Sequence, residues 1–217
     1  MKDIAKANEM LTKAQNGDEK AKFNTGVFFM QQEPRDFEKG RYWYEEALKE
    51  GHKKGCQIQD CGYNLLLSYL RDSGIGEAET VNVLEKLAYT YNDYWGKITL
   101  GSLYCGSKHV MLVSLLETAS FSSYKNLKKG ITLIEEGVAI GKKFLDYDDY
   151  NMISGAYHIC GGHKNADNLF DIIQKLKKAI EYHEKVLELS PPKYLDMNKQ
   201  LMEAYKKQLA DREAQIK

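Results

Sequence analysis

Two short residue patterns each recur four times along this chain of 217 residues. The first is a small residue or a leucine followed three places later by an aromatic residue, which puts both side chains on one face of a helix. It occurs at Gly26/Phe29, Leu66/Tyr69, Gly101/Tyr104 and Ser154/Tyr157. The second joins residues seven places apart, or two helical turns, at Gly40/Ala47, Thr80/Leu87, Gly130/Gly137 and Ala179/Val186. Because the second pattern follows the first each time, the sequence predicts four helical hairpins, each with a helix A and a helix B.

The hairpins are expected at about residues 18–51, 60–92, 94–141 and 147–190, with a capping helix at 193–217. Recurrence of one helical unit along a chain is typical of solenoids. Only 3 prolines interrupt the 217 residues, which favours helix throughout. The sequence therefore predicts a single all-α domain over 1–217, a helical-hairpin repeat solenoid (an α/α superhelix) closed by a C-terminal capping helix.

Two connections between helices A and B are longer than the others. Residues 106–126 contain the apolar run 110–116, which predicts an additional helical turn or short helix. Residues 161–165 read Gly-Gly-His-Lys-Asn and predict a loop.

The first hairpin resembles a known family. The run from Ala14 to Phe29 resembles the opening of a Sel-like repeat, a subclass of the tetratricopeptide repeats, and the run from Lys39 to His52 resembles its second half. Residues 184–191 at the end of the fourth hairpin are closer to an ordinary tetratricopeptide ending. The resemblance implies a right-handed superhelix that serves as a protein-binding scaffold and has no chemistry of its own.

Charge and hydropathy exclude several classes of protein. The 31 basic and 31 acidic side chains cancel, which argues against a nucleic-acid binder. The first twenty residues carry scattered charges and no apolar core of a signal peptide, and the apolar run 110–116 is too short to cross a membrane. We expect a cytoplasmic protein that binds neither nucleic acid nor a membrane.

Two groups of residues could hold a metal ion. One is His52, Cys56 and Cys61, and the other is His158, Cys160 and His163. A zinc site needs about four converging ligands, and neither group supplies four. Phosphate-binding glycine loops and nucleophile elbows are missing from the sequence. We therefore expect no metal, no cofactor and no enzymatic activity, and a metal-dependent enzyme using His158, Cys160 and His163 is the least favoured alternative.

A partner site follows from the resemblance. In repeats of this type the inner face is formed by helix A positions that flank the packing pair. The same offsets nominate Lys20, Phe23, Asp60, Tyr63, Arg71, Trp95, Ile98, Asp148, Asn151 and His158. Large aromatics mixed with charges of both signs suit a selective groove for a peptide or helix of another protein.

Three points about this site stay open. Phe23 and Val27 stand where the carboxylate-clamp tetratricopeptide domains have Lys and Asn, so a C-terminal acidic tail is not the favoured ligand. Tyr63 and Trp95 are alternatively residues that pack between hairpins. The chain is alternatively a structural subunit that associates with itself through an edge of the solenoid, and its oligomeric state is not predicted.

Overall fold

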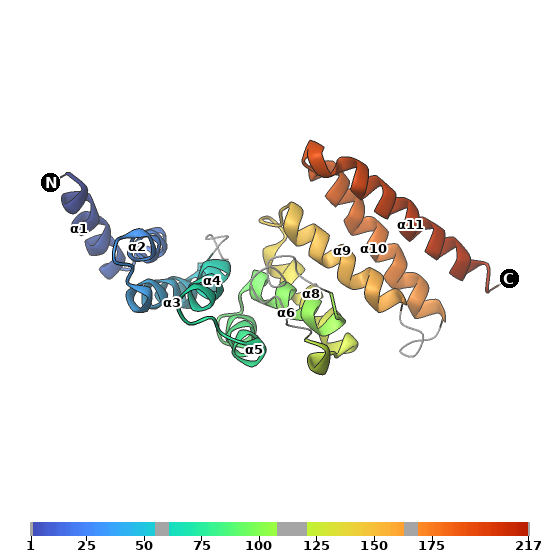
Figure 1. Cartoon of the computed structure of the whole chain (residues 1–217), viewed down its shortest axis with the longest axis horizontal. Coiled ribbons are helices and arrows are strands. Elements are labelled where there is room, and N and C mark those ends of the chain that lie inside the picture. Colours follow the sequence, from blue (N-terminus) through green and yellow to red (C-terminus); the bar gives the residue numbers. More distant parts are fainter. Residues whose placement is uncertain (1, 55–60, 108–120, 163–168, 217) are drawn as a thin grey trace. The chain divides into compact units, whose positions relative to one another are not determined.

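The structure is a computed structural model that describes residues 2–54, 61–107, 121–162 and 169–216. These residues form ten α-helices and no β-strand, which confirms the all-α prediction (Figure 1). Contacts divide the chain into two compact units, Met1–Lys97 and Ile98–Lys217, which we call the N-terminal and the C-terminal unit. Each unit is described by itself.

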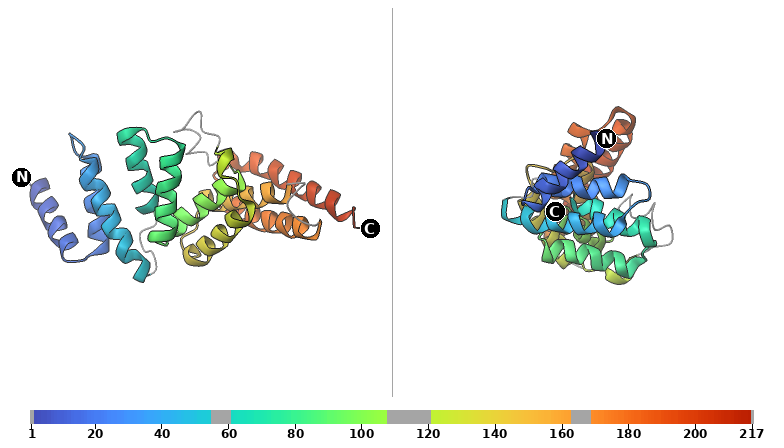
Figure 2. Two further views of the ribbon diagram at one scale, coloured as in Figure 1. Left: turned by 90° about the horizontal axis from the view of Figure 1, so that it is seen from below. Right: turned by 90° about the vertical axis from the view of Figure 1, so that its left-hand side faces the viewer.

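The helices of the N-terminal unit pack in the order of the chain. They are α1 (Lys2–Gln15), α2 (Glu19–Gln31), α3 (Phe37–Lys54), α4 (Cys61–Ser73), α5 (Glu77–Glu85) and the π-helical turn η1 (Lys86–Thr90). Each of α2, α3, α4 and α5 packs against the helix that precedes it, and Figure 2 shows α2 beside α3. The first two predicted hairpins are therefore α2 with α3, and α4 with α5.

The third and fourth predicted hairpins are α6 with α8, and α9 with α10. Their bounds, with those of the elements around them, are α6 (Tyr94–Cys105), η2 (Ser122–Tyr124), α8 (Leu127–Gly141), α9 (Tyr147–Gly162), α10 (Leu169–Leu189), η3 (Pro192–Tyr194) and α11 (Leu195–Glu213). Helix α10 packs against both α9 and α11, and α11 takes the place of the predicted capping helix. The predicted short helix at 110–116 lies outside the described residues.

One predicted loop is partly wrong. Gly161 and Gly162 belong to the last turn of α9. Gly161 is buried, and a Cβ atom on it would lie 3.0 Å from Leu176 of α10. Gly161 therefore allows α9 and α10 to approach each other, and it is a helix-packing residue and not a loop residue.

Acidic or amide side chains start five of the helices. Asp18, Asp36, Asp93, Asn126 and Asp146 each accept a hydrogen bond from a backbone N–H of the first turn, at 2.7–3.1 Å. Such N-caps satisfy donors that have no partner inside the helix and suit its positive end. The local sequence thus fixes where α2, α3, α6, α8 and α9 begin.

The two recurring patterns meet inside the hairpins. A Cβ atom on Gly26 of α2 would lie 3.2 Å from the carbonyl oxygen of Gly40 of α3. The hydroxyl of Ser154 in α9 donates to the carbonyl oxygen of Ala179 in α10 at 3.0 Å. In the second hairpin both anchors, Leu66 and Thr80, are fully buried. The first residue of each pattern therefore lies at the helix A–helix B crossing in the first and fourth hairpins, and Gly101 and Gly130 do the same in the third.

A lysine next to the helix B anchor covers the helix A aromatic ring in three hairpins. The ammonium nitrogens of Lys39, Lys129 and Lys178 lie 5.4, 4.7 and 5.2 Å from the ring centres of Phe29, Tyr104 and Tyr157. In the second hairpin the equivalent position is Glu79, and Arg41 of the preceding helix covers Tyr69 at 4.7 Å instead. The recurring unit thus includes a cation–π contact that the two patterns did not predict.

A glutamate five residues after the helix B anchor makes ion pairs to other helices. Glu45 of α3 accepts from Lys86 at 2.7 Å. Glu135 of α8 accepts from Lys178 of α10 at 2.6 Å and from the hydroxyl of Tyr157 at 3.1 Å. These carboxylates link one helix B to the hairpin that follows it.

Candidate partner-binding surface

Two of the nominated residues lie one turn apart on α2. Lys20 is exposed, and Phe23 is half-buried. The Phe23 ring lies 5.7 Å from the ring of Tyr44, which is itself buried in α3. This contact holds one side of the Phe23 ring against the core and leaves the other side partly open.

Two more nominated residues lie on α4. Tyr63 is half-buried and Arg71 is exposed. Tyr63 meets Trp95 edge to face, with ring centres 5.7 Å apart and planes at 84°. Burial raises the pKa of the Tyr44 phenol, and the positive charge of Arg71 partly offsets that shift.

Four of the nominated residues therefore lie on two helices of the N-terminal unit, two on α2 and two on α4. We call Lys20, Phe23, Tyr63 and Arg71 the α2–α4 face. It combines two partly open aromatic rings with two exposed cations. Asp60 lies outside the described residues.

Two nominations are corrected. Trp95 exposes 7% of its surface and Ile98 exposes none. Every residue from Asp93 to Cys105 is buried, so α6 has no open face along its length. A helix that is covered all round belongs to the core. Of the two readings of Trp95, packing between helices is therefore the correct one.

Two nominations lie on the first turns of α9, in the C-terminal unit. Asp148 is exposed and Asn151 is half-buried. The pKa of the Asp148 carboxyl is raised, first by partial burial and then by the charge of Asp146. Asp146 accepts from the backbone N–H groups of Asp148 and Asp149, and Asp149 accepts from the N–H of Asp146 at 3.2 Å. This acidic segment therefore has a local role, because it caps α9.

His158, the last nomination, is covered by α11. Its Nε2 lies 2.6 Å from Oε1 of Gln208, and its ring stacks on Tyr205 with centres 4.1 Å apart. Burial lowers the pKa of His158. No local pattern predicts this contact, because the partners of His158 lie almost fifty residues further along the chain.

The groups considered for metal binding are engaged in the fold where the structure describes them. The thiol of Cys61 donates to the backbone oxygen of Tyr44 at 3.2 Å. Cys160 and Cys105 are both fully buried. The His52 side chain, Cys56 and His163 lie outside the described residues. Across the described ranges, no three His, Cys, Asp or Glu side chains are arranged to hold a metal ion.

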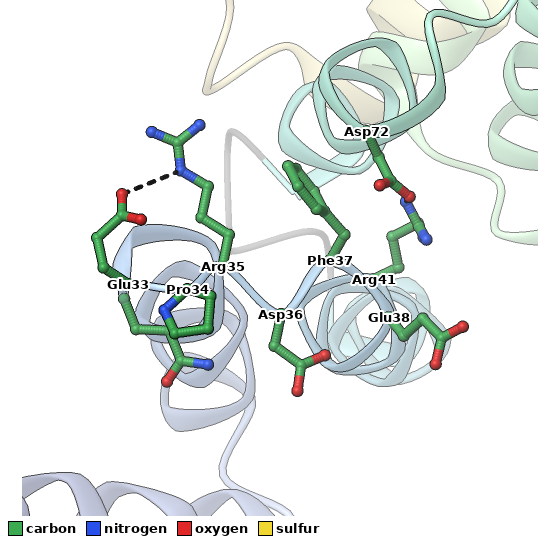
Figure 3. A pocket seen from close by; sticks show the side chains of 9 residues that line it. Glu33, Pro34, Arg35, Asp36, Phe37, Glu38, Arg41 and Asp72 are labelled. Carbon is green, nitrogen blue, oxygen red and sulfur yellow. Dashed lines mark hydrogen bonds and ion pairs between the residues drawn. The ribbon is translucent and has the colours of Figure 1, made fainter.

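A hollow of about 500 Å³ opens where the α2–α3 connection approaches the end of α4 (Figure 3). It is lined by residues 32–38, Arg41 and Asp72, and none of these is buried. Arg41 and Asp72 point toward each other and pair at 2.8 Å, and Arg35 lies 3.9 Å from Glu33. Its arginines are thus already paired within the chain, and the hollow is a polar surface recess.

The helices described here include none long and apolar enough to cross a membrane. Comparison of the chain with protein-family models, with curated proteins and with solved structures gave no match.

Proposed function

We propose that this chain is a non-catalytic scaffold, built from helical hairpins as a solenoid, that binds a peptide or helix of a partner protein on the α2–α4 face. One observation carries the proposal. Phe23 and Tyr63 are partly open aromatic rings, and each is fixed by a ring contact to a buried aromatic residue, Tyr44 or Trp95.

Fixed aromatic side chains suit binding because little conformational entropy is lost when they are covered. Aromatic and arginine side chains also dominate the binding energy of protein interfaces. Lys20 and Arg71 add positive charge at the same face. The partner segment we expect carries an apolar side chain for Phe23 or Tyr63 and at least one carboxylate for the cations.

The Sel-like resemblance of the first hairpin supports the same reading, because those repeats bind proteins. Helix α2 and helix α3 are the two halves of that resemblance. The four residues of the α2–α4 face occupy the helix A positions that flank the packing pair in such repeats.

The proposal is tested by affinity capture from the native organism with quantitative proteomics. The wild-type chain is compared with Phe23→Ala and Tyr63→Ala. The controls are Tyr42→Ala and Tyr89→Ala, which remove aromatics that are 56% and 51% exposed on α3 and η1. All variants are first shown to be folded by circular dichroism.

We expect a set of proteins that the controls retain and that the two face variants lose, with affinity lowered at least about tenfold. Retention of the same proteins by all four variants contradicts the α2–α4 face as the site.

A second candidate function is self-association, which α11 favours. Met197 and Leu201 lie one turn apart on α11 and are 52% and 37% exposed, and Leu189 at the end of α10 is 49% exposed. Light scattering coupled to size-exclusion chromatography distinguishes the two. A dimer that Leu201→Lys converts to a monomer supports the structural role, and a monomeric wild-type chain excludes it.

A further inference from the structure

Helix α11 covers two histidines. His158 of α9 and His183 of α10 both contact the ring of Tyr205, at 4.1 and 5.2 Å between ring centres. His183 and Tyr205 are buried, and His158 is half-buried. The tyrosine of α11 therefore lies against one histidine from each of the two helices beneath it.

His183 is held in a defined tautomer. Its Nε2 lies 2.9 Å from the backbone oxygen of Asn198 in α11, so Nε2 carries the proton. Its Nδ1 faces the hydroxyl of Ser154 at 3.3 Å. The neutral ring thus donates to α11 through Nε2 and lies against Ser154 of α9 through Nδ1.

Ser154 also explains a variation in the recurring pattern. It holds the helix A anchor position that is glycine in the first and third hairpins. In the fourth hairpin the hydroxyl contacts helix B twice, donating to the carbonyl oxygen of Ala179 and facing Nδ1 of His183, both in α10.

No negative charge within the described ranges is placed against these rings. The groups placed against His183 are Ser154 and His158 from α9, and Tyr205 and the Asn198 carbonyl from α11. Those placed against His158 are Tyr205 and Gln208 from α11, and His183 from α10. Among the described residues, neither imidazole has a carboxylate partner. The ion pair that joins α10 to the end of α11, Lys177 with Glu213 at 3.0 Å, is exposed.

We propose that α11 is a pH-sensitive latch that stays docked on α9 and α10 while His158 and His183 are neutral and undocks when they take up protons. A second proton on His183 replaces the lone pair at Nδ1 with an N–H group and buries a positive charge between three helices. A proton on His158 adds a like charge close to it. Undocking returns both imidazoles to water and uncovers the side of α9 that carries His158.

The direction of the pH effect follows from the two histidines. Burial lowers the pKa of both, and the charge of His158 lowers that of His183 further. The docked state therefore binds fewer protons than the undocked state as pH falls below the ordinary histidine pKa of about 6.5. The equilibrium constant for docking of α11 is unchanged above that pH. Below it, this constant falls by at most about tenfold per histidine for each pH unit.

The test is amide hydrogen exchange of the full chain between pH 7.5 and 5.5, corrected for the intrinsic exchange rate at each pH. We expect the protection of α11 amides to fall at least about threefold over this range. Protection of α9 and α10, and of α2 in the other unit, stays constant. Flat protection of α11, or a joint loss in α9, α10 and α11, overturns the latch.

Variants assign the effect to the histidines. His158→Phe keeps an aromatic ring against Tyr205 and removes one of the two titrating groups. We therefore expect the change in the logarithm of the α11 protection factor between pH 7.5 and 5.5 to be half that of the wild type. The control His52→Phe removes a histidine of α3 and leaves it unchanged. NMR titration of the wild-type histidines needs no variant: the latch is wrong if His158 and His183 titrate at or above pH 6.5 in the folded chain.

Discussion

Gly101 and Gly130 bring the backbones of α6 and α8 into direct contact. A Cβ atom on Gly101 would lie 2.6 Å from the carbonyl oxygen of Gly130, and one on Gly130 would lie 2.7 Å from the carbonyl oxygen of Gly101. Both distances are shorter than a Cβ atom can approach another atom. The neighbouring atoms belong to the backbone, which cannot move aside as the end of a flexible side chain can. The close crossing of α6 and α8 in the third hairpin therefore needs glycine at both positions.

Replacing Gly101 with Leu should force α6 and α8 apart. We expect a loss of roughly 1–3 kcal/mol in the free energy of unfolding, because the crossing is overpacked. Urea denaturation followed by circular dichroism measures it. Gly155→Ala is the matched control on α9, since its Cβ would lie 3.5 Å from Ser107, an ordinary contact. That variant should be unchanged or gain up to about 1 kcal/mol of helix propensity. Equal stability of the Leu variant and the parent contradicts the crossing.

Trp95→Ala should damage the fold. The side chain is 7% exposed and packs edge to face on Tyr63, so its removal leaves a cavity that costs roughly 3–5 kcal/mol. Thermal unfolding followed by circular dichroism tests this. Tyr89→Ala, at an exposed aromatic position of the same unit, should change stability by less than about 0.5 kcal/mol. If the Trp95→Ala chain is as stable as the parent, the Trp95 side chain is not part of the core.

The cation–π contact in the fourth hairpin should be measurable. Lys178 lies over the ring of Tyr157 and pairs with Glu135. Lys178→Met keeps the aliphatic stem and removes the charge. We expect a loss of roughly 0.5–1 kcal/mol, since the ion pair is half exposed and screened by water. In contrast, Lys206→Met on α11, whose pair with Glu203 is 3.5 Å long and exposed, should show no change. Equal urea midpoints for the two variants contradict a stabilising role for the ring contact.

Much of the fold could be predicted from spacing alone. Small residues at the helix crossings and aromatics three places later are local signals, and they located α2, α3, α6, α8, α9 and α10. Positions such as Gly26 and Gly40 were identified because close helix approach restricts the residue type at both sites.

The candidate site was predicted less completely, for physical reasons. Transferring one offset to every hairpin assumes that each helix A has an open face, and α6 has none. A signal for this existed, since Lys97 is the sole charged residue between Tyr94 and Cys105. The covering of His158 had no local signal, because it depends on Tyr205 and Gln208 of α11.

Site-specific photo-crosslinking is the sharpest test of partner binding on the α2–α4 face, since it reports contact and does not rely on loss of binding. A photoreactive phenylalanine is placed at Phe23 or Tyr63, and at the control positions Tyr42 or Tyr89, and the chain is irradiated in native extract. We expect one common partner segment to be crosslinked from positions 23 and 63 and not from positions 42 or 89. A partner crosslinked from the control positions and not from the α2–α4 face would contradict it.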